Sequence, residues 1–203
     1  MIRLLLFIAS LLLFCLGDLI TVETSRGKVQ GFDHNMGNDT SKLFFGYGQV
    51  FLGIPFAKPP IGERRFSLPE PLYQFNRDRT VHNATYYRPR CWQKSKNSDN
   101  LSEDCLYLNV MTPHILGKFP VMVYIHGGTF TTGGADEFHW KGAIRNLVSR
   151  GVVIVTIQYR VGFYGFFTTF TEQFPANRGL YDQVMALRWV NEEIEHFGGD
   201  SSR

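Results

Sequence analysis

The sequence predicts an α/β fold. Two continuous runs rich in β-branched residues, Pro120–Ile125 and Gly151–Ile157, are typical of strands buried on both faces, as in a parallel sheet. Between them, Lys141–Ser149 carries apolar residues at helical spacing, which indicates a strand-helix-strand unit. A longer amphipathic helix near residue 190 adds a second covering element.

Strands also begin the chain. Ile20–Thr24 and Lys28–Phe32 are predicted to be strands, and Ser25–Gly27 is the turn between them. A further short strand at Gln49–Leu52 is expected to stop at Gly53, because the prolines that follow forbid a helix.

The middle of the chain predicts irregular structure and then one more strand. Phe56–Pro71 is expected to be an irregular surface segment, and Leu106–Met111 is expected to be a strand that ends at Pro113. The last helix has one stripe that is apolar throughout, because apolar residues recur every three or four positions at Leu180, Val184, Leu187, Val190, Ile194 and Phe197.

The end of that helix is also predicted. Gly198 and Gly199 are expected to terminate it. Three acidic residues lie off the apolar stripe, so the sequence favours a solvated face for Glu192, Glu193 and Glu195.

Residues 1–17 resemble a signal peptide. One positive charge precedes the apolar run Leu4–Leu16, and small residues before Asp18 suit cleavage at that point. An uncleaved membrane anchor is the alternative. No later stretch is long enough to span a membrane, so we expect a secreted chain in which 18–203 forms one domain.

The charge pattern and the cysteines agree with that compartment. The 21 basic and 18 acidic residues form no block, which argues against a nucleic acid partner. Cleavage would leave Cys91 and Cys105, for which a secretory route predicts a disulfide, although two unrelated buried thiols are the alternative. Sequons make Asn38, Asn83 and Asn100 candidates for N-glycosylation.

The stretch from His126 to Phe130 carries the most chemical information. A glycine-rich loop directly after a buried strand exposes backbone N–H groups, and such groups can stabilise an oxyanion. An ordinary tight turn is the alternative at this point.

Several segments together resemble the type-B carboxylesterases, the family that includes cholinesterases and neuroligins. The resemblance covers nearly all of 18–203 and rests on Phe51–Ala57, Arg64–Phe66, Ser102–Val110, Val123–Gly128, Tyr159–Gly162, Gly179–Gln183 and Phe197–Asp200. It implies an incomplete α/β-hydrolase fold: an N-terminal β-hairpin and the first part of a central, mostly parallel sheet.

The same resemblance implies a serine hydrolase that cleaves a small-molecule carboxylic ester through an acyl-enzyme, with no cofactor and no metal. It assigns the oxyanion hole to Gly128 and Thr129, with Gly127 shaping the turn. It matches Cys91 and Cys105 to the first disulfide of the family.

The chain departs from the family pattern at important positions. Thr129 stands where many active members have glycine or alanine, and a β-branched residue tolerates fewer dihedral angles. The cysteine loop lacks the methionine-tryptophan pair of cholinesterases, so a choline ester is not expected; Trp92 is expected to pack beside the disulfide.

No catalytic residue can be assigned. No serine has the glycine-x-serine-x-glycine setting of the family's nucleophile, so the nucleophile, acid and base are expected beyond Arg203 and the chain is expected to be inactive alone. His126 is expected to have a structural role. The remaining histidines are expected at the surface, namely His34, His82, His114, His139 and His196.

Three interpretations remain open. The first is the N-terminal segment of a secreted esterase, and the second is a non-catalytic, neuroligin-like adhesion or binding member of the same family. The third is a truncated inactive product. In each case the strand that carries the family's serine would lie beside Val121–Ile125, and its absence is expected to leave an apolar sheet edge that invites aggregation.

Overall fold

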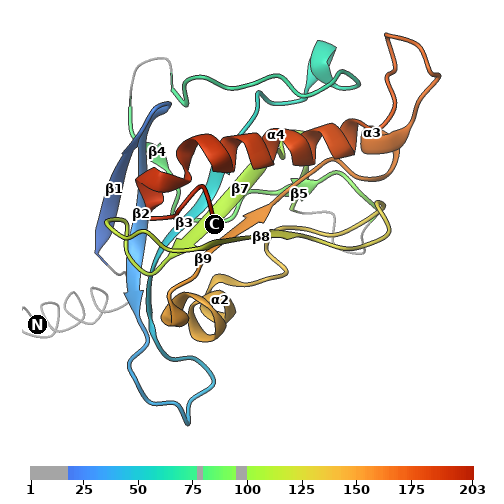
Figure 1. Ribbon diagram of the computed structural model, residues 1–203. Helices are drawn as coiled ribbons and strands as arrows, with labels where there is room; N and C mark the ends of the chain where they lie inside the picture. Colours follow the sequence, from blue (N-terminus) through green and yellow to red (C-terminus); the bar gives the residue numbers. More distant parts are fainter. Residues whose placement is uncertain (1–17, 77–79, 95–99) are drawn as a thin grey trace, which may run out of the picture.

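The computed structural model describes residues 18–76, 80–94 and 100–203 (Figure 1). The signal-peptide prediction for 1–17 lies outside these residues. Within the described ranges, no helix is both long enough and apolar enough to cross a membrane.

A seven-stranded sheet forms the centre of the fold. Its order is β1-β2-β3-β7-β9-β8, and β4 pairs with β2. The β8 and β9 strands are parallel neighbours, which confirms the predicted strand-helix-strand unit; from β1 to β9 the other neighbours along this order are antiparallel. The strands are β1 (Leu19–Thr24), β2 (Gly27–Asn35), β3 (Tyr47–Pro55), β4 (His82–Asn83), β7 (Tyr107–Thr112), β8 (Val121–Ile125) and β9 (Val153–Ile157).

The β3 strand continues past the predicted stop at Gly53. The pairing with β7 shifts register between Phe51 and Ile54, so the chain makes a β-bulge there and does not end the strand. Gly53 adopts a left-handed φ of 75°, and its N–H donates to Oδ1 of Asn109 at 2.8 Å. The expected break is therefore a bulge, because glycine allows the local kink without loss of pairing.

The short elements were mostly not predicted. They are η1 (Gly62–Arg64), β5 (Arg90–Cys91), β6 (Leu101–Ser102), η2 (Val148–Arg150) and α3 (Gly162–Phe166). The β5 and β6 strands pair in parallel next to the cysteines. The segment Phe56–Pro71, expected to be an irregular surface, begins with two residues, Phe56 and Ala57, whose side chains are buried.

Helices cover both faces of the sheet. The long α4 (Arg178–Glu193) lies along one face, whereas α2 (Trp140–Asn146) lies against the other (Figure 1). Each face has its own hydrophobic cluster: Phe51 and Val155 pack toward Trp189 and its neighbours, and Ile154 packs toward Ile144 of α2. Because adjacent strand residues point to opposite faces, continuous apolar runs supply both clusters.

The end of α4 agrees with the prediction, but the orientation of its side chains partly does not. The helix continues into η3 (Ile194–Phe197), and Gly198 terminates it with a left-handed φ of 78°. The apolar stripe is buried only from Val190 onward, whereas Leu180, Val184 and Leu187 are each at least 40% exposed.

Glu193 was expected to be solvated and is instead fully buried. Its carboxylate accepts hydrogen bonds from the backbone N–H and the hydroxyl of Ser25, and it pairs with Nε of Arg26 at 3.2 Å. The turn of the β1–β2 hairpin is thereby attached to the end of α4. A buried carboxylate needs such partners, and they lie 167 and 168 residues away in the sequence, so helical spacing alone could not reveal them.

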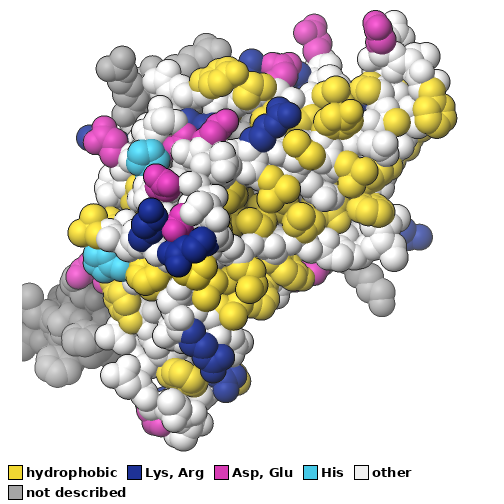
Figure 2. Space-filling view, viewed as in Figure 1, with side chains coloured by type: hydrophobic (Ala, Val, Ile, Leu, Met, Phe, Trp, Pro, Cys, Tyr) yellow, Lys and Arg dark blue, Asp and Glu magenta, His cyan; other side chains and the backbone are white. Residues whose placement is uncertain are grey.

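Hydrophobic side chains gather on the face that α4 and β8 share. Figure 2 shows them over α4 and the adjoining sheet edge. On this face Val121 and Val123 of β8 line a groove with Leu187 of α4. Ile125, which is 39% exposed, lies on the same side of β8. On its outer side, β8 has one backbone partner among the described residues, a hydrogen bond from the N–H of Val121 to the carbonyl oxygen of Arg203 at 2.9 Å.

Replacement of Glu193 by leucine should destabilise the protein by about 3 kcal/mol, because Nε of Arg26 and the two donors of Ser25 would lose their buried acceptor and Arg26 would keep only its ion pair with the exposed Glu192. Chemical denaturation of the complete natural gene product that carries this sequence measures the change. Glu195→Gln, on an exposed position two residues later, is the control and should alter the free energy of unfolding by less than about 0.5 kcal/mol. Equal effects of the two substitutions would contradict a buried role for Glu193.

Residues 18–203 expressed alone should self-associate through the exposed face of α4 and β8, because a free apolar edge recruits further strands. Light scattering measures the association. Leu187→Glu should reduce it, whereas Leu116→Glu, at a residue that is 85% exposed and outside this face, should not. A monomeric, cooperatively melting preparation of 18–203 would contradict the prediction.

Candidate active site

The glycine-rich loop (residues 126–133) follows β8 directly and folds back on itself. The carbonyl oxygen of Gly128 accepts hydrogen bonds from the N–H groups of Thr131 and Thr132 at 2.9 and 3.1 Å. The hydroxyl of Thr129 donates to the same oxygen at 2.8 Å. The carbonyl of Gly128 thus closes the turn.

The backbone N–H groups of Gly127, Gly128 and Thr129 donate to no acceptor among the described residues. All three residues are exposed. Successive unpaired amides in a loop closed by its own hydrogen bonds can donate to a developing negative charge without first breaking other bonds. Such a loop has the chemistry of an oxyanion hole.

The unusual dihedral angles fall one position later than the sequence suggests. Gly127, which was expected to shape the turn, has no left-handed φ, and a Cβ there would meet nothing within 4 Å. Gly128 has a φ of 109°, and a Cβ there would lie 2.1 Å from the carbonyl oxygen of Thr132. Gly128 is therefore the residue that cannot carry a side chain.

Two residues after it are strained. Thr129 and Phe130 have φ values of 53° and 61°, in the left-handed region that residues other than glycine rarely occupy. Each costs on the order of 1–2 kcal/mol in this conformation. Strain of this kind persists where surrounding contacts determine the backbone, and it concentrates at functional sites.

Phe130 was not singled out by the sequence. Its side chain is 50% exposed, and the centroid of its ring lies 5.0 Å from the ring centroid of Phe166 in α3. Its carbonyl oxygen accepts the N–H of Gly162 at 2.6 Å. These contacts join the glycine-rich loop to α3 and to a cluster of rings around it, formed by Phe66, Phe163, Tyr164, Phe167 and Phe174.

His126 holds the start of the glycine-rich loop through hydrogen bonds and ring stacking. Its ring is buried and stacks on Tyr159 at 4.3 Å, and Nδ1 donates to the carbonyl oxygen of Gly127 at 2.9 Å. Burial lowers the pKa of His126 below its ordinary value, and the bond to Gly127 opposes this shift only in part. The Tyr159 hydroxyl donates to the carbonyl oxygen of His126 at 3.0 Å, which fixes the start of the loop.

No nucleophile and base are brought together among 18–76, 80–94 and 100–203. No serine hydroxyl in these ranges is hydrogen-bonded to a histidine. His114, His139 and His196 are exposed, as expected. His82 is only partly exposed, because its Nε2 contacts the carbonyl oxygen of Gly53 at 2.9 Å.

Cys91 and Cys105 form the disulfide that the sequence predicts, with the two Cα atoms 4.9 Å apart. The sequon residues Asn38, Asn83 and Asn100 are all exposed. Trp92, expected to pack beside the disulfide, is 45% exposed.

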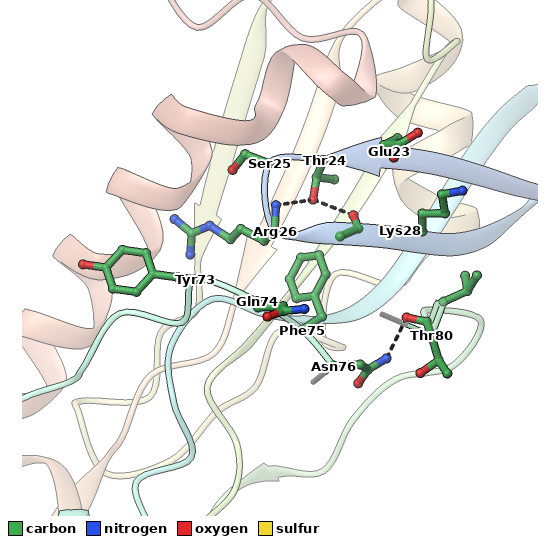
Figure 3. A pocket seen from close by; sticks show the side chains of 12 residues that line it. Glu23, Thr24, Ser25, Arg26, Lys28, Tyr73, Gln74, Phe75, Asn76 and Thr80 are labelled. Atoms are coloured by element: carbon green, nitrogen blue, oxygen red, sulfur yellow. Dashed lines mark hydrogen bonds between the residues drawn. The ribbon is translucent and has the colours of Figure 1, made fainter. Parts of the chain in front are cut away.

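One cavity lies away from the glycine-rich loop. It has a volume of about 840 Å³ and opens beside the β1–β2 turn, between Arg26, Lys28, Tyr73 and Phe75 (Figure 3). This turn belongs to the opposite end of the sheet from β8. No cluster of side chains that could hold a metal ion occurs in the part of the chain that the structure describes.

Comparison with known proteins gives consistent results. A family profile described as "Carboxylesterase family" matches residues 18–203. The chain is similar to Carboxylesterase 1E of Mus musculus, with 42% identity over 197 residues that cover 88% of this chain and 33% of that protein. It is also similar to Gut esterase 1 of Caenorhabditis briggsae, with 40% identity over 200 residues, 95% of this chain and 33% of that protein.

Among solved structures, the fold is similar to juvenile hormone esterase from Manduca sexta, whose crystal structure has OTFP covalently attached. The TM-score is 0.78 at 31% identity, over 90% of this chain and 34% of that one. The chain thus spans about a third of the length of the relatives it matches.

The lowered pKa of His126 predicts a loss of stability in mild acid. The unfolded state takes up a proton near pH 6.5, whereas the folded state resists it to a lower pH, so the contribution is fully present above pH 6.5 and is lost as the pH falls below it. Melting temperatures between pH 5 and 8 measure this trend. His126→Asn should flatten the acid limb, and His114→Asn, at an exposed position, should leave its slope unchanged; identical slopes in both variants would contradict the assignment.

Proposed function

Because the chain belongs to the carboxylesterase family, we propose that it is the N-terminal segment of a secreted serine hydrolase that cleaves carboxylic esters. The observation that carries the proposal is the row of unpaired amides at Gly127, Gly128 and Thr129. In ester cleavage, the carbonyl oxygen becomes negatively charged in each tetrahedral intermediate, and these N–H groups would stabilise that charge. One such donor typically contributes about 10²–10³-fold to the rate.

The residues of this chain would supply the oxyanion hole and its support, and other residues would supply the attack. A serine would form the acyl-enzyme, a histidine would move its proton, and a carboxylate would orient the histidine. No serine of the sequence stands in the elbow motif, which supports a nucleophile, acid and base located beyond Arg203. No cofactor enters this chemistry.

The surroundings of the loop favour an apolar small-molecule ester. Phe130 joins the amides to the aromatic cluster at α3, where Phe163 and Phe167 are 58% and 38% exposed. An alkyl or aryl group of the substrate would bury apolar area against these rings while its carbonyl oxygen faces the amides.

Residues 1–17 would be a cleaved signal peptide that directs the chain to the secretory pathway. The Cys91–Cys105 disulfide supports this route, because disulfides persist in oxidising compartments. Asn38, Asn83 and Asn100 are exposed and would be available for N-glycosylation.

The proposal predicts that the complete natural gene product hydrolyses p-nitrophenyl esters. Gly128→Ala should lower kcat by about 10²-fold, because the added Cβ would collide with the Thr132 carbonyl and displace the donors. Gly142→Ala, in α2, is the matched control: a Cβ there meets nothing within 4 Å, and kcat should be unchanged.

Absence of ester hydrolysis in the correctly folded gene product would overturn the proposal and favour a neuroligin-like binding role on the same scaffold. The proposal expects an elbow-motif serine in the part of the gene product beyond Arg203. Hydrolysis that survives replacement of that serine would also overturn the proposal.

A further inference from the structure

The side chain of Gln93 grips the backbone of the glycine-rich loop. Its Oε1 accepts the N–H of Gly133 at 2.8 Å, and its Nε2 donates to the carbonyl oxygen of the same residue at 2.8 Å. Nε2 also donates to the carbonyl oxygen of Cys91 at 3.0 Å. One amide thus satisfies both backbone groups of Gly133, as a neighbouring strand would.

Gly133 is packed directly against the start of the loop. A Cβ at this residue would lie 2.2 Å from Nδ1 of His126 and 2.5 Å from the carbonyl oxygen of Gly127. Its φ of 122° suits only glycine. Any displacement of Gly133 would therefore move the residues that carry the unpaired amides.

The backbone around Gln93 is itself held in place. Two residues earlier, Cys91 is joined to Cys105, and the N–H of Trp92 donates to the carbonyl oxygen of Ser102 at 3.1 Å. Beside it, Arg90 binds the carboxylate of Asp136 through two hydrogen bonds of 2.7 and 3.0 Å. The disulfide segment therefore holds the chain at two places: at Gly133, where the glycine-rich loop ends, and at Asp136, three residues further on.

We propose that Gln93 is a positioning residue for the oxyanion hole: by clamping Gly133 against His126 and Gly127, it holds the amides of Gly127, Gly128 and Thr129 in the geometry that the tetrahedral intermediate requires. The inference rests on the proposed esterase function. Gln93 touches neither the substrate nor the reacting atoms, and it acts through the backbone.

The test uses Gln93→Met in the complete natural gene product, because methionine keeps the length of the side chain and removes both hydrogen-bonding atoms. Gln93→Glu is a second variant; its carboxylate keeps the acceptor for Gly133 but faces two carbonyl oxygens. Gln74→Met, at an exposed glutamine, is the matched control. The measurements are kcat and KM for a p-nitrophenyl ester, the Ki of a trifluoromethyl ketone, and amide hydrogen exchange over residues 126–134.

Both Gln93 variants should lower kcat on the order of 10–100-fold, as misplacement of a catalytic group by about 1 Å does, and should change KM by less than about threefold. The Ki of the ketone should rise in proportion to the loss of kcat, because its hemiketal oxyanion uses the same amides. Exchange of the hydrogen-bonded amides of this segment, those of Thr131, Thr132 and Gly133, should accelerate at least about tenfold, with the rest of the protein unchanged.

Wild-type kcat in the Gln93 variants would overturn the proposal, whether or not exchange accelerates. A loss of kcat accompanied by faster exchange throughout the protein would overturn it as well, since this pattern indicates general destabilisation. If the wild-type protein lacks esterase activity, the proposed function fails; accelerated exchange confined to 126–134 would then still establish the clamp.

Discussion

The buried ion pair between Arg160 and Asp182 determines how the parts of this fold meet. Arg160 follows β9 and Asp182 lies in α4, so two side-chain hydrogen bonds of 2.8 Å attach the helix to the sheet. The Nη1 group of Arg160 also donates to the carbonyl oxygen of Ser67 at 2.9 Å. This bond attaches the irregular segment Phe56–Pro71 to the same arginine. A Cβ at Gly179 would lie 2.3 Å from the carbonyl oxygen of Arg160, so the elements touch at backbone distance. Tyr159, the preceding residue, supports the glycine-rich loop, and the position of that loop thus depends on the same ion pair.

Local periodicity predicted the elements of this fold well and their environment less well. The parallel pair β8 and β9 and the helix between them follow from continuous apolar runs and helical spacing, which depend on neighbouring residues alone. The burial of Glu193 depends on Ser25 and Arg26, which are distant in sequence, and no local pattern contains that information. The bulge at Gly53 is similar: its glycine signals an interruption, but only the partner strand decides between an end and a kink.

The candidate site could be located from the sequence because its chemistry lies in the backbone. A glycine-rich stretch after a buried strand indicates exposed amides whatever the distant residues are. Which glycine bears the left-handed dihedral could not be predicted, since two adjacent glycines give no local signal to distinguish them; the contact of Gly128 with Thr132 decides it. The role of Gln93 was also hidden, because a polar residue after a cysteine reads as a surface position until its distance from Gly133 is known.

The left-handed conformation of Thr129 has an evolutionary consequence. A residue other than glycine can occupy this position only while the contacts around the loop outweigh its strain. The sequence freedom of position 129 is therefore conditional on positions 93 and 133, and substitutions at these three sites should be epistatic. A lineage that first strengthens the contact between Gln93 and Gly133 can then accept bulkier residues at position 129. A lineage that loses this contact would be confined to glycine at position 129.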